Sequence, residues 1–214
     1  MGIQIGSLTR DDVDRASRLL SRAFAEDPII TFYLRGRRRK IALPAFFAAV
    51  LEEMLPFGHV YDAQINGRLV GAAAWLPPDA VGPDDGAKRR ARRYQQQVQR
   101  LFPSSSRDLY AGFSALEDFH PREPHWYLAF VGIAPSWQSR GMGRALLQPV
   151  MDLADAANRS CYLETPFPRT HPFYERLGFT RRAEHSPFPG APQGVVTFLR
   201  SGGDNRRSAK DDKG

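Results

Sequence analysis

The segment that most constrains this chain runs from an apolar strand through a glycine turn into a helix. Residues 126–133 are a nearly continuous apolar run, Ala134-Pro135 ends it, and residues 144–157 have helical spacing. Such a run suits a strand buried on both faces of a partly parallel sheet. A further strand at residues 160–165 completes a βαβ unit. We therefore expect an α/β fold built on a mixed sheet.

The other segments alternate between strand and helix patterns. We expect strands at residues 3–8, 59–65, 69–76, 179–184 and 195–199, and helices at 9–24, 28–34, 41–55, 87–101, 104–119 and a short one ending at Gly178. Asn66-Gly67 predicts a tight hairpin, because a type I′ turn needs positive φ at both central residues. Thr9, Asp27 and Ser104 are expected helix caps.

Length and composition indicate one globular domain over residues 1–200. The chain has 214 residues, 42% of them hydrophobic and 25% charged. Residues 201–214 are polar and aperiodic, and are predicted to be a disordered tail. The single cysteine, Cys161, excludes an internal disulfide and predicts a reducing compartment. Without a signal-peptide pattern or an apolar run of about 18 residues, we expect a cytoplasmic protein that makes no membrane contact.

The net charge of +7 is concentrated in two runs, at residues 35–40 and 88–93. Both runs are interpreted either as solvated faces or, for one of them, as a contact for cofactor phosphates. They also leave open a nucleic-acid-binding protein without catalysis, because clustered arginines attract phosphate backbones. No helix-turn-helix, zinc-finger or RNA-binding pattern accompanies them, so nucleic acid is not the expected partner.

The glycine turn predicts a phosphate site at residues 139–144. Gly141 and Gly143 remove side chains where a ligand must approach the backbone. The first N–H groups of the following helix lack partners and attract anions, and Arg140 and Arg144 add positive charge. A Walker A loop would need Gly-Lys-Ser/Thr, which is absent, and the dinucleotide fingerprint would need a third glycine where Leu146 stands.

What remains is Gln138-x-x-Gly141-x-Gly143 after an apolar strand, followed by a second block at residues 171–179 with Tyr174 and a Leu-Gly-Phe turn. Together they resemble the GNAT superfamily of N-acetyltransferases, densely over residues 120–180 and thinly over 1–80. The pattern is closest to the group of puromycin N-acetyltransferase and its bacterial relatives. This resemblance implies a central mixed, mainly antiparallel sheet flanked by helices. Phe167 and Thr170 depart from the asparagine or small residues common in that group.

The resemblance also implies a division of labour, with acceptor-side elements at residues 9–125 and an acetyl-CoA-binding half at 126–180. It implies that acetyl-CoA is the cosubstrate and that the acetyl group moves directly to a primary amine of a small molecule. Tyr174 matches the family's general acid, and a backbone N–H near residues 131–133 would stabilise the oxyanion. The expected cofactor contacts are Val131, Gly132, Ile133, Gln138, Ser139, Arg140, Gly141, Met142, Gly143 and Arg144.

The general base stays open at this point. Glu164 leads, because it lies on the strand beside the expected cofactor, and the other candidates are Asp27, Glu117, Asp118, His120 and His125. His171 could border the channel or cap its helix. An aromatic acceptor wall could come from Phe24, Phe32, Tyr33, Trp75 and Phe113. No residues have metal-ligand spacing, so no metal is expected.

Three further alternatives remain for the whole protein. The acceptor could be a protein lysine, since the basic surface would suit acidic partner sites. The chain could bind acetyl-CoA without catalysis, although Tyr174 is present. It could be a monomer or a homodimer.

Overall fold

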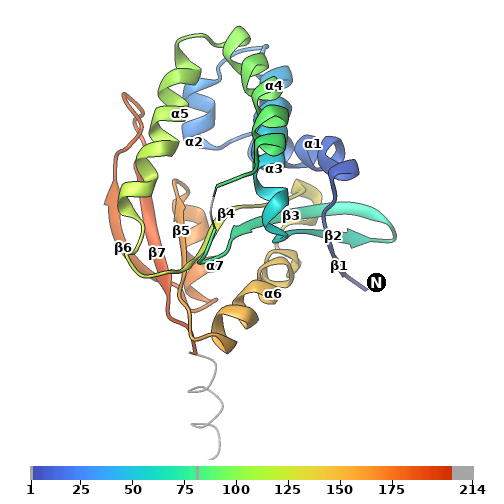
Figure 1. The fold of residues 1–214 in the computed structure, drawn as a ribbon, viewed down its shortest axis with the longest axis vertical. Coiled ribbons are helices and arrows are strands. Elements are labelled where there is room, and N and C mark those ends of the chain that lie inside the picture. The colour runs from blue at the N-terminus through green and yellow to red at the C-terminus, as the bar shows by residue number, and fades with distance from the viewer. Residues whose placement is uncertain (1, 81, 204–214) are drawn as a thin grey trace, which may run out of the picture.

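A seven-stranded mixed sheet forms the centre of the molecule (Figure 1). The structure, a computed structural model, describes residues 2–80 and 82–203. The strand order is β1-β2-β3-β4-β5-β7-β6, and every pairing is antiparallel except that of β4 with β5. The strands are β1 Gln4–Ser7, β2 Val60–Ile65, β3 Arg68–Leu76, β4 Trp126–Ile133, β5 Cys161–Thr165, β6 Thr180–His185 and β7 Val195–Arg200. The predicted mixed, mainly antiparallel sheet is confirmed.

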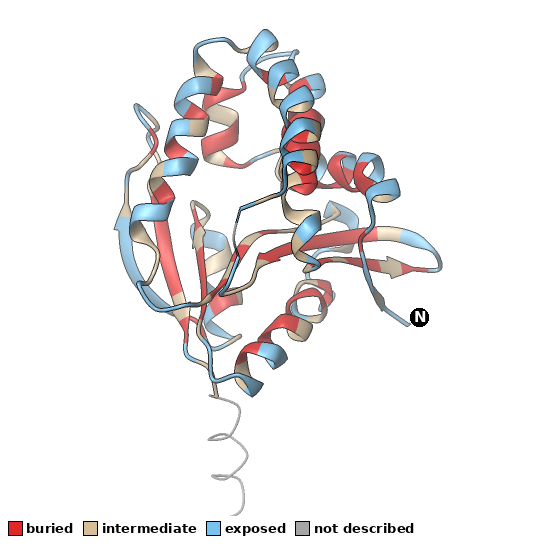
Figure 2. Ribbon diagram, in the orientation of Figure 1, coloured by how far each residue is buried: buried red, intermediate tan, exposed pale blue. Residues whose placement is uncertain are grey.

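Helices cover both faces of this sheet, and buried side chains mark the two contacts (Figure 2). The helices are α1 Val13–Ala23, α2 Pro28–Tyr33, α3 Arg39–Met54, α4 Asp85–Leu101, α5 Ser105–Ala115, α6 Met142–Ala156 and α7 His171–Glu175. Alternate residues of β3 serve different cores, as a strand's period of two requires. Ala72 and Ala74 pack with α1–α5, whereas Ala73 and Trp75 pack with α6. Within residues 2–80 and 82–203, no helix is long and apolar enough to cross a membrane.

Local signals in the sequence explain several of these boundaries. Asn66 and Gly67 have φ values of 50° and 72°, so the predicted tight hairpin is confirmed. Asp27 caps α2 by accepting the Ile30 N–H at 2.9 Å, and Thr9 shares a capping box with Asp12. Ser104 precedes α5 but makes no capping bond, so that part of its predicted role is wrong.

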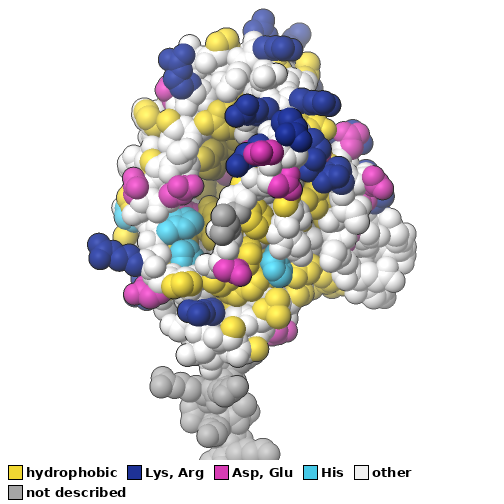
Figure 3. All heavy atoms as spheres, viewed as in Figure 1, with side chains coloured by type: hydrophobic (Ala, Val, Ile, Leu, Met, Phe, Trp, Pro, Cys, Tyr) yellow, Lys and Arg dark blue, Asp and Glu magenta, His cyan; other side chains and the backbone are white. Residues whose placement is uncertain are grey.

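Basic side chains gather over the helical end of the molecule (Figure 3), and the two basic runs belong to α4 and to the segment that leads into α3. Most of their side chains are exposed. Arg90 instead binds the buried Glu52 of α3 at 2.6 Å, and Arg39 donates to the Ala25 carbonyl at 2.6 Å. Neither run lines the cavity. The cavity lining therefore gives no support to a contact with cofactor phosphates, which stays a prediction, and Arg39 and Arg90 serve helix packing.

The sheet opens between β4 and β5. These strands pair only at Trp126–Cys161 and Tyr127–Tyr162, while β3 stays paired with β4 as far as Ile133. A bulge at Ala129 breaks the β3–β4 register at the same level. Residues of β4 consequently alternate between buried and half-buried. Both faces of β4 pack against a core, as the sequence predicts, since Phe130 belongs to the α1–α5 core and Leu128 to the α6 core, although residues 128–133 also border the opening.

A buried ion pair fastens the C-terminal strand to the helix behind it. Arg200 of β7 binds the Asp155 carboxylate through two hydrogen bonds of 2.7 Å, and its Nε donates to the Leu177 carbonyl. Gly203 also donates its N–H to Asp155 at 3.1 Å. The start of the predicted disordered tail is thus bonded to α6, and residues 204–214 lie outside the described residues.

We expect Asp155→Asn to lower the free energy of unfolding at pH 7 by about 3 kcal/mol, because it removes the carboxylate that binds the buried Arg200 side chain through two hydrogen bonds. Arg200 holds the pKa of Asp155 below its usual 3.8, so this stabilisation is complete above that pH and is lost as the pH falls through the native pKa. Urea unfolding at several pH values measures it. Asp14→Asn, which breaks the exposed pair with Arg18, should cost under about 1 kcal/mol. Equal losses of unfolding free energy in the two variants would contradict a larger stabilisation by the buried Arg200–Asp155 pair.

Candidate active site

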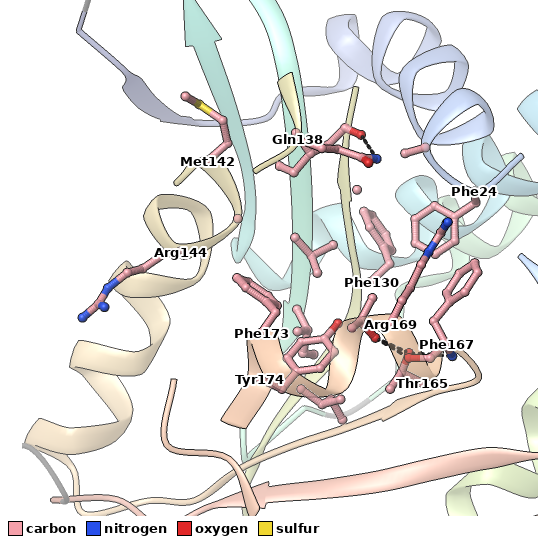
Figure 4. Close-up of a pocket in the computed structure, with 18 of the residues that line it drawn as sticks. Phe24, Phe130, Gln138, Met142, Arg144, Thr165, Phe167, Arg169, Phe173 and Tyr174 are labelled. Atoms are coloured by element: carbon pink, nitrogen blue, oxygen red, sulfur yellow. Dashed lines mark hydrogen bonds between the residues drawn. The ribbon is translucent and has the colours of Figure 1, made fainter. Parts of the chain in front are cut away.

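The opening between β4 and β5 holds a cavity of about 700 Å³ (Figure 4). One wall is β4, the other is the end of β5 with α7, and the glycine turn and the end of α1 close the sides. Its lining comprises residues 23, 24, 27, 128–133, 137–139, 141–144, 163–167, 169, 170, 173, 174, 176 and 177. Because β5 no longer pairs with β4 beyond Tyr127, both strands turn unshared backbone edges towards this space.

The glycine turn is a concave backbone site for an anion. Ser139 and Gly141 have φ values of 59° and 81°, and Arg140 between them has negative φ. Alternating handedness of this kind directs successive N–H groups to one side, which creates an anion-binding nest. The N–H groups of residues 142–144 add to it, because a helix start has no internal acceptors for them. The predicted phosphate site thus has the required geometry.

The two glycines of this turn have different roles. A Cβ on Gly141 would meet nothing within 4 Å, so this position is open to a ligand. A Cβ on Gly143 would lie 3.0 Å from the Phe173 ring. Gly143 therefore lets α7 pack against α6, and it lines the cavity as Gly141 does, so a role of both glycines in ligand approach stays a prediction.

Side chains of the turn contribute less to the cavity than its backbone does. Gln138 donates from Nε2 to the Ile133 carbonyl at 3.1 Å and so ties the turn back to the end of β4. The Arg140 guanidinium lies 5.2 Å from the centre of the Trp137 ring. Met142 is buried in the α6 core, and the exposed Arg144 side chain points away from the cavity in Figure 4. Of these residues, Met142 and Arg144 offer the cavity mainly their backbone.

Tyr174 is buried and stands on the α7 side of the cavity, with its hydroxyl directed into the space (Figure 4). Its ring packs among Phe173, Phe179 and Phe198. The turn at Gly178, with φ at +86°, returns the chain so that the Phe179 N–H bonds the Tyr174 carbonyl. Burial raises the pKa of Tyr174 above 10, so the phenol keeps its proton at neutral pH.

Two carboxylates line the cavity, and they come from opposite walls. Glu164 lies on β5 and Asp27 at the start of α2. Burial raises the pKa of Asp27 to about 6, against two backbone N–H bonds that lower it. Glu117 and Asp118 are exposed and do not line the cavity, so they are excluded as direct bases. His120 does not line it either, but its Nε2 lies 3.2 Å from Glu164 Oε1.

The aromatic lining differs from the predicted wall. Of the five expected aromatic residues only Phe24 lines the cavity. Phe32 and Tyr33 pack in the helical core and Trp75 in the α6 core, whereas Phe113 is exposed and its ring contacts Phe46 and Phe188. Phe130 and Phe167 take their place (Figure 4). Phe130 was missed because an apolar residue in a strand gives no sign that its sheet opens. None of the described residues between 28 and 127, those of the hairpin and the insert included, lines the cavity.

The remaining sequence candidates are structural. His171 does not line the cavity, and its ring contacts Phe198. Cys161 is buried, and burial raises the pKa of its thiol to about 12, which suits an inert side chain. In the part of the chain that the structure describes, no group of three or more His, Cys, Asp or Glu residues could hold a metal ion.

An apolar-walled cleft with an anion nest at one end and a buried phenol at the other suits a thioester cosubstrate that carries a diphosphate. The sequence pattern of the acetyltransferase (GNAT) family matches residues 22–179, which include all of these elements. The chain belongs to this family. It is therefore an acetyltransferase, and acetyl-CoA is the cosubstrate of the family.

Individual relatives agree with this membership. An uncharacterized N-acetyltransferase of Schizosaccharomyces pombe is 23% identical over 179 residues, which cover 78% of this chain and 70% of the relative. A histone acetyltransferase HPA2-related protein of Corynebacterium glutamicum has a TM-score of 0.70 at 24% identity, with 94% of this chain and 96% of that one covered. The polyamine N-acetyltransferase of Drosophila melanogaster, which forms N-acetylagmatine, has a TM-score of 0.60 at 16% identity, with coverages of 94% and 100%. At these identities the solved structures share the fold alone.

We expect Asp27→Asn to become more stable than the wild type as the pH rises from 4 to 7.5. The fold favours protonated Asp27. The stabilisation that the protonated carboxyl gives to the folded state is therefore complete below pH 3.8 and is lost as the pH rises through about 6. Asparagine keeps an oxygen for the Ile30 N–H but carries no charge. The stability difference should grow by about 1–3 kcal/mol over this range. Urea midpoints measure it, with Glu26→Gln as the exposed neighbouring control. A stability difference that does not change with pH would contradict the raised pKa of Asp27.

Proposed function

We propose that this acetyltransferase moves the acetyl group of acetyl-CoA directly to a primary amine of a small molecule. The observation that carries the proposal is the parting of β4 and β5 between an anion nest and a buried phenol. A thioester can then lie along β4 with its diphosphate on residues 139–144. Residues 1–200 would act as one domain, with the acceptor entering from the side of α1 and α2.

The backbone of β4 would hold the pantetheine part and stabilise the oxyanion. Residues 129–133 border the cavity on the side where β5 has separated, which leaves strand-edge groups for the cosubstrate amides. A backbone N–H near residues 131–133 would face the developing negative charge. Gln138 already occupies the Ile133 carbonyl, so amide pairing would use the positions before it.

Tyr174 would act as the general acid for the departing thiolate. Its hydroxyl faces the cavity, and burial keeps it protonated. Because a thiolate with a pKa near 8.5 is less basic than the phenolate, Tyr174 would give up its proton only as it receives the second amine proton, while the C–S bond breaks. Glu164 would take the proton that the incoming ammonium loses, since it lines the cavity from the neighbouring strand.

The acceptor end favours a cationic amine. Asp27 and Glu164 supply negative charge, and Phe24, Phe130 and Phe167 offer aromatic faces to an ammonium ion. The Drosophila relative in fold acetylates agmatine, which has this chemistry. Agmatine and spermidine are therefore the first acceptors to assay, with puromycin included because of the sequence resemblance described above.

We expect Gly141→Asp to weaken acetyl-CoA binding at least about tenfold, which is 1.4 kcal/mol, because it places a carboxylate in the anion nest. Gly58→Asp is the matched control: Gly58 also has positive φ, at +74°, and open space for a Cβ, but lies outside the cavity. Titration calorimetry compares the two with the wild type. Unchanged binding in Gly141→Asp, or equal losses in both variants, would contradict the phosphate assignment.

We expect Tyr174→Phe to lower kcat by about 10²–10⁴ while the KM for acetyl-CoA changes little. Removing one hydroxyl leaves the ring packing intact, so the effect would be chemical. Tyr110→Phe, at a half-buried tyrosine whose hydroxyl is buried outside the cavity, should keep the wild-type rate. The assay follows thiol release with agmatine or whichever amine the screen identifies. A wild-type kcat in Tyr174→Phe would reduce Tyr174 to a core aromatic.

A further inference from the structure

A file of titratable side chains connects the cavity with the surface behind β5. Glu164 lines the cavity, and its Oε1 lies 3.2 Å from His120 Nε2. His120 Nδ1 is 3.3 Å from His125 Nε2, and His125 Nδ1 is 2.8 Å from the Glu123 carbonyl in the exposed loop before β4. Each ring therefore faces one neighbour with each nitrogen, as a proton relay requires.

The surroundings select the protonation states of this file. The Glu123 carbonyl can only accept, so His125 carries its proton on Nδ1 and offers Nε2 as an acceptor. His120 can then donate from Nδ1 to His125 Nε2, and its own Nε2 faces the Glu164 carboxylate. A proton that Glu164 takes from the cavity would have to cross the 3.2 Å between Glu164 Oε1 and His120 Nε2.

The carboxylate at the inner end of this file is buried. The Glu164 side chain is 4% exposed, and its Oε1 has no hydrogen bond within residues 2–80 and 82–203. The rings of Tyr127 and Tyr162 lie 4.5 and 4.7 Å from the His120 ring, where aromatic faces favour a cation. The titratable and charged groups around His120 are Glu164 and Tyr162 on β5, Tyr127 on β4, Glu117 on the preceding turn, and Glu123 and His125 in the loop.

The far end of the file suits proton release. Burial lowers the pKa of His125, so this ring is neutral near pH 7 and gives up an added proton readily. Burial, together with the charge of Glu164, raises the pKa values of Tyr127 and Tyr162, so both phenols stay neutral. The two other carboxylates named above, Glu117 and Glu123, are exposed, so neither would hold the proton inside.

We propose that Glu164, His120 and His125 form a proton exit path for the acceptor amine. This inference rests on the proposed amine acetylation. An ammonium and acetyl-CoA yield an amide, a thiol and one proton. The ammonium loses its first proton to Glu164, the nitrogen lone pair forms the C–N bond, and the C–S bond breaks. The thiolate receives the second nitrogen-bound proton by way of Tyr174. The proton on Glu164 passes to His120, then to His125 and water.

His120 and His125 thus act through Glu164 as positioning residues, and a pH profile tests them. With agmatine as the acceptor, kcat/KM of His120→Gln should fall at least tenfold at pH 7. The loss should shrink as the pH approaches the pKa of the amine, about 10.4 for a lysine-like group, because an amine that arrives neutral needs no exit path. A loss of the same size at every pH would reveal a structural role and overturn the proposal.

His59→Gln is the matched control, because His59 is also half-buried beside aromatic rings but lies outside the file. It should keep the wild-type profile. A wild-type profile in His120→Gln as well would overturn the exit path while leaving the acetyltransferase assignment intact.

A second measurement needs no acceptor. In ¹⁵N spectra of the histidine rings, Glu164→Gln should move the nitrogen resonances of both His120 and His125 and leave those of His59 and His171 unchanged. Unmoved His120 and His125 resonances would overturn the file, whatever the activity. If the wild type acetylates none of agmatine, spermidine and puromycin, the proposed function fails, and these spectra still decide whether Glu164 shares a proton with the two rings.

Discussion

The separation of β4 from β5 after two residue pairs governs everything else in this structure. Parallel strands that stayed paired would satisfy each other's backbone groups and leave no space for a ligand. Here β3 holds one edge of β4 in register, and β7 holds β5 along its whole length. The opening between β4 and β5 is therefore held by a paired strand on each side. It exposes a strand edge, and it brings α6 and α7 to face one cavity.

Packing around the opening explains the positions of the anion nest and Tyr174. Gly143 allows the Phe173 ring to approach α6, and this contact sets the distance between the anion nest and Tyr174. The Gly178 turn and the Arg200–Asp155 pair fix the other end of α7 against the sheet. Tyr174 therefore depends on residues that never touch the cavity. A catalytic phenol gains from such support, because its hydroxyl must stay aligned within a fraction of an ångström.

Charge in this molecule is divided between two surfaces with different tasks. The basic runs, the most conspicuous feature of the composition, solvate and pack the helices over one face, and Arg90 neutralises the buried Glu52. The cavity instead collects two carboxylates and its aromatic rings. A net charge of +7 thus gives no indication of what the cavity attracts. His120 and His125 lie behind Glu164 and connect this end of the cavity with the loop before β4.

The sequence by itself determined the elements whose signals are local. The hairpin at Asn66-Gly67, the Asp27 cap, the glycine turn with its helix start and the Leu-Gly-Phe turn after Tyr174 each follow from a few adjacent residues. Glu164 was also predicted as a candidate base, because it lies on the strand beside the expected cofactor, and it lines the cavity. Only the tertiary structure decided which aromatic residues line the cavity, that Gly143 serves packing, and that His120 and His125 stand in file behind Glu164. These facts depend on where two strands stop pairing, and strand pairing is a contact between distant segments that leaves no periodic trace in either one.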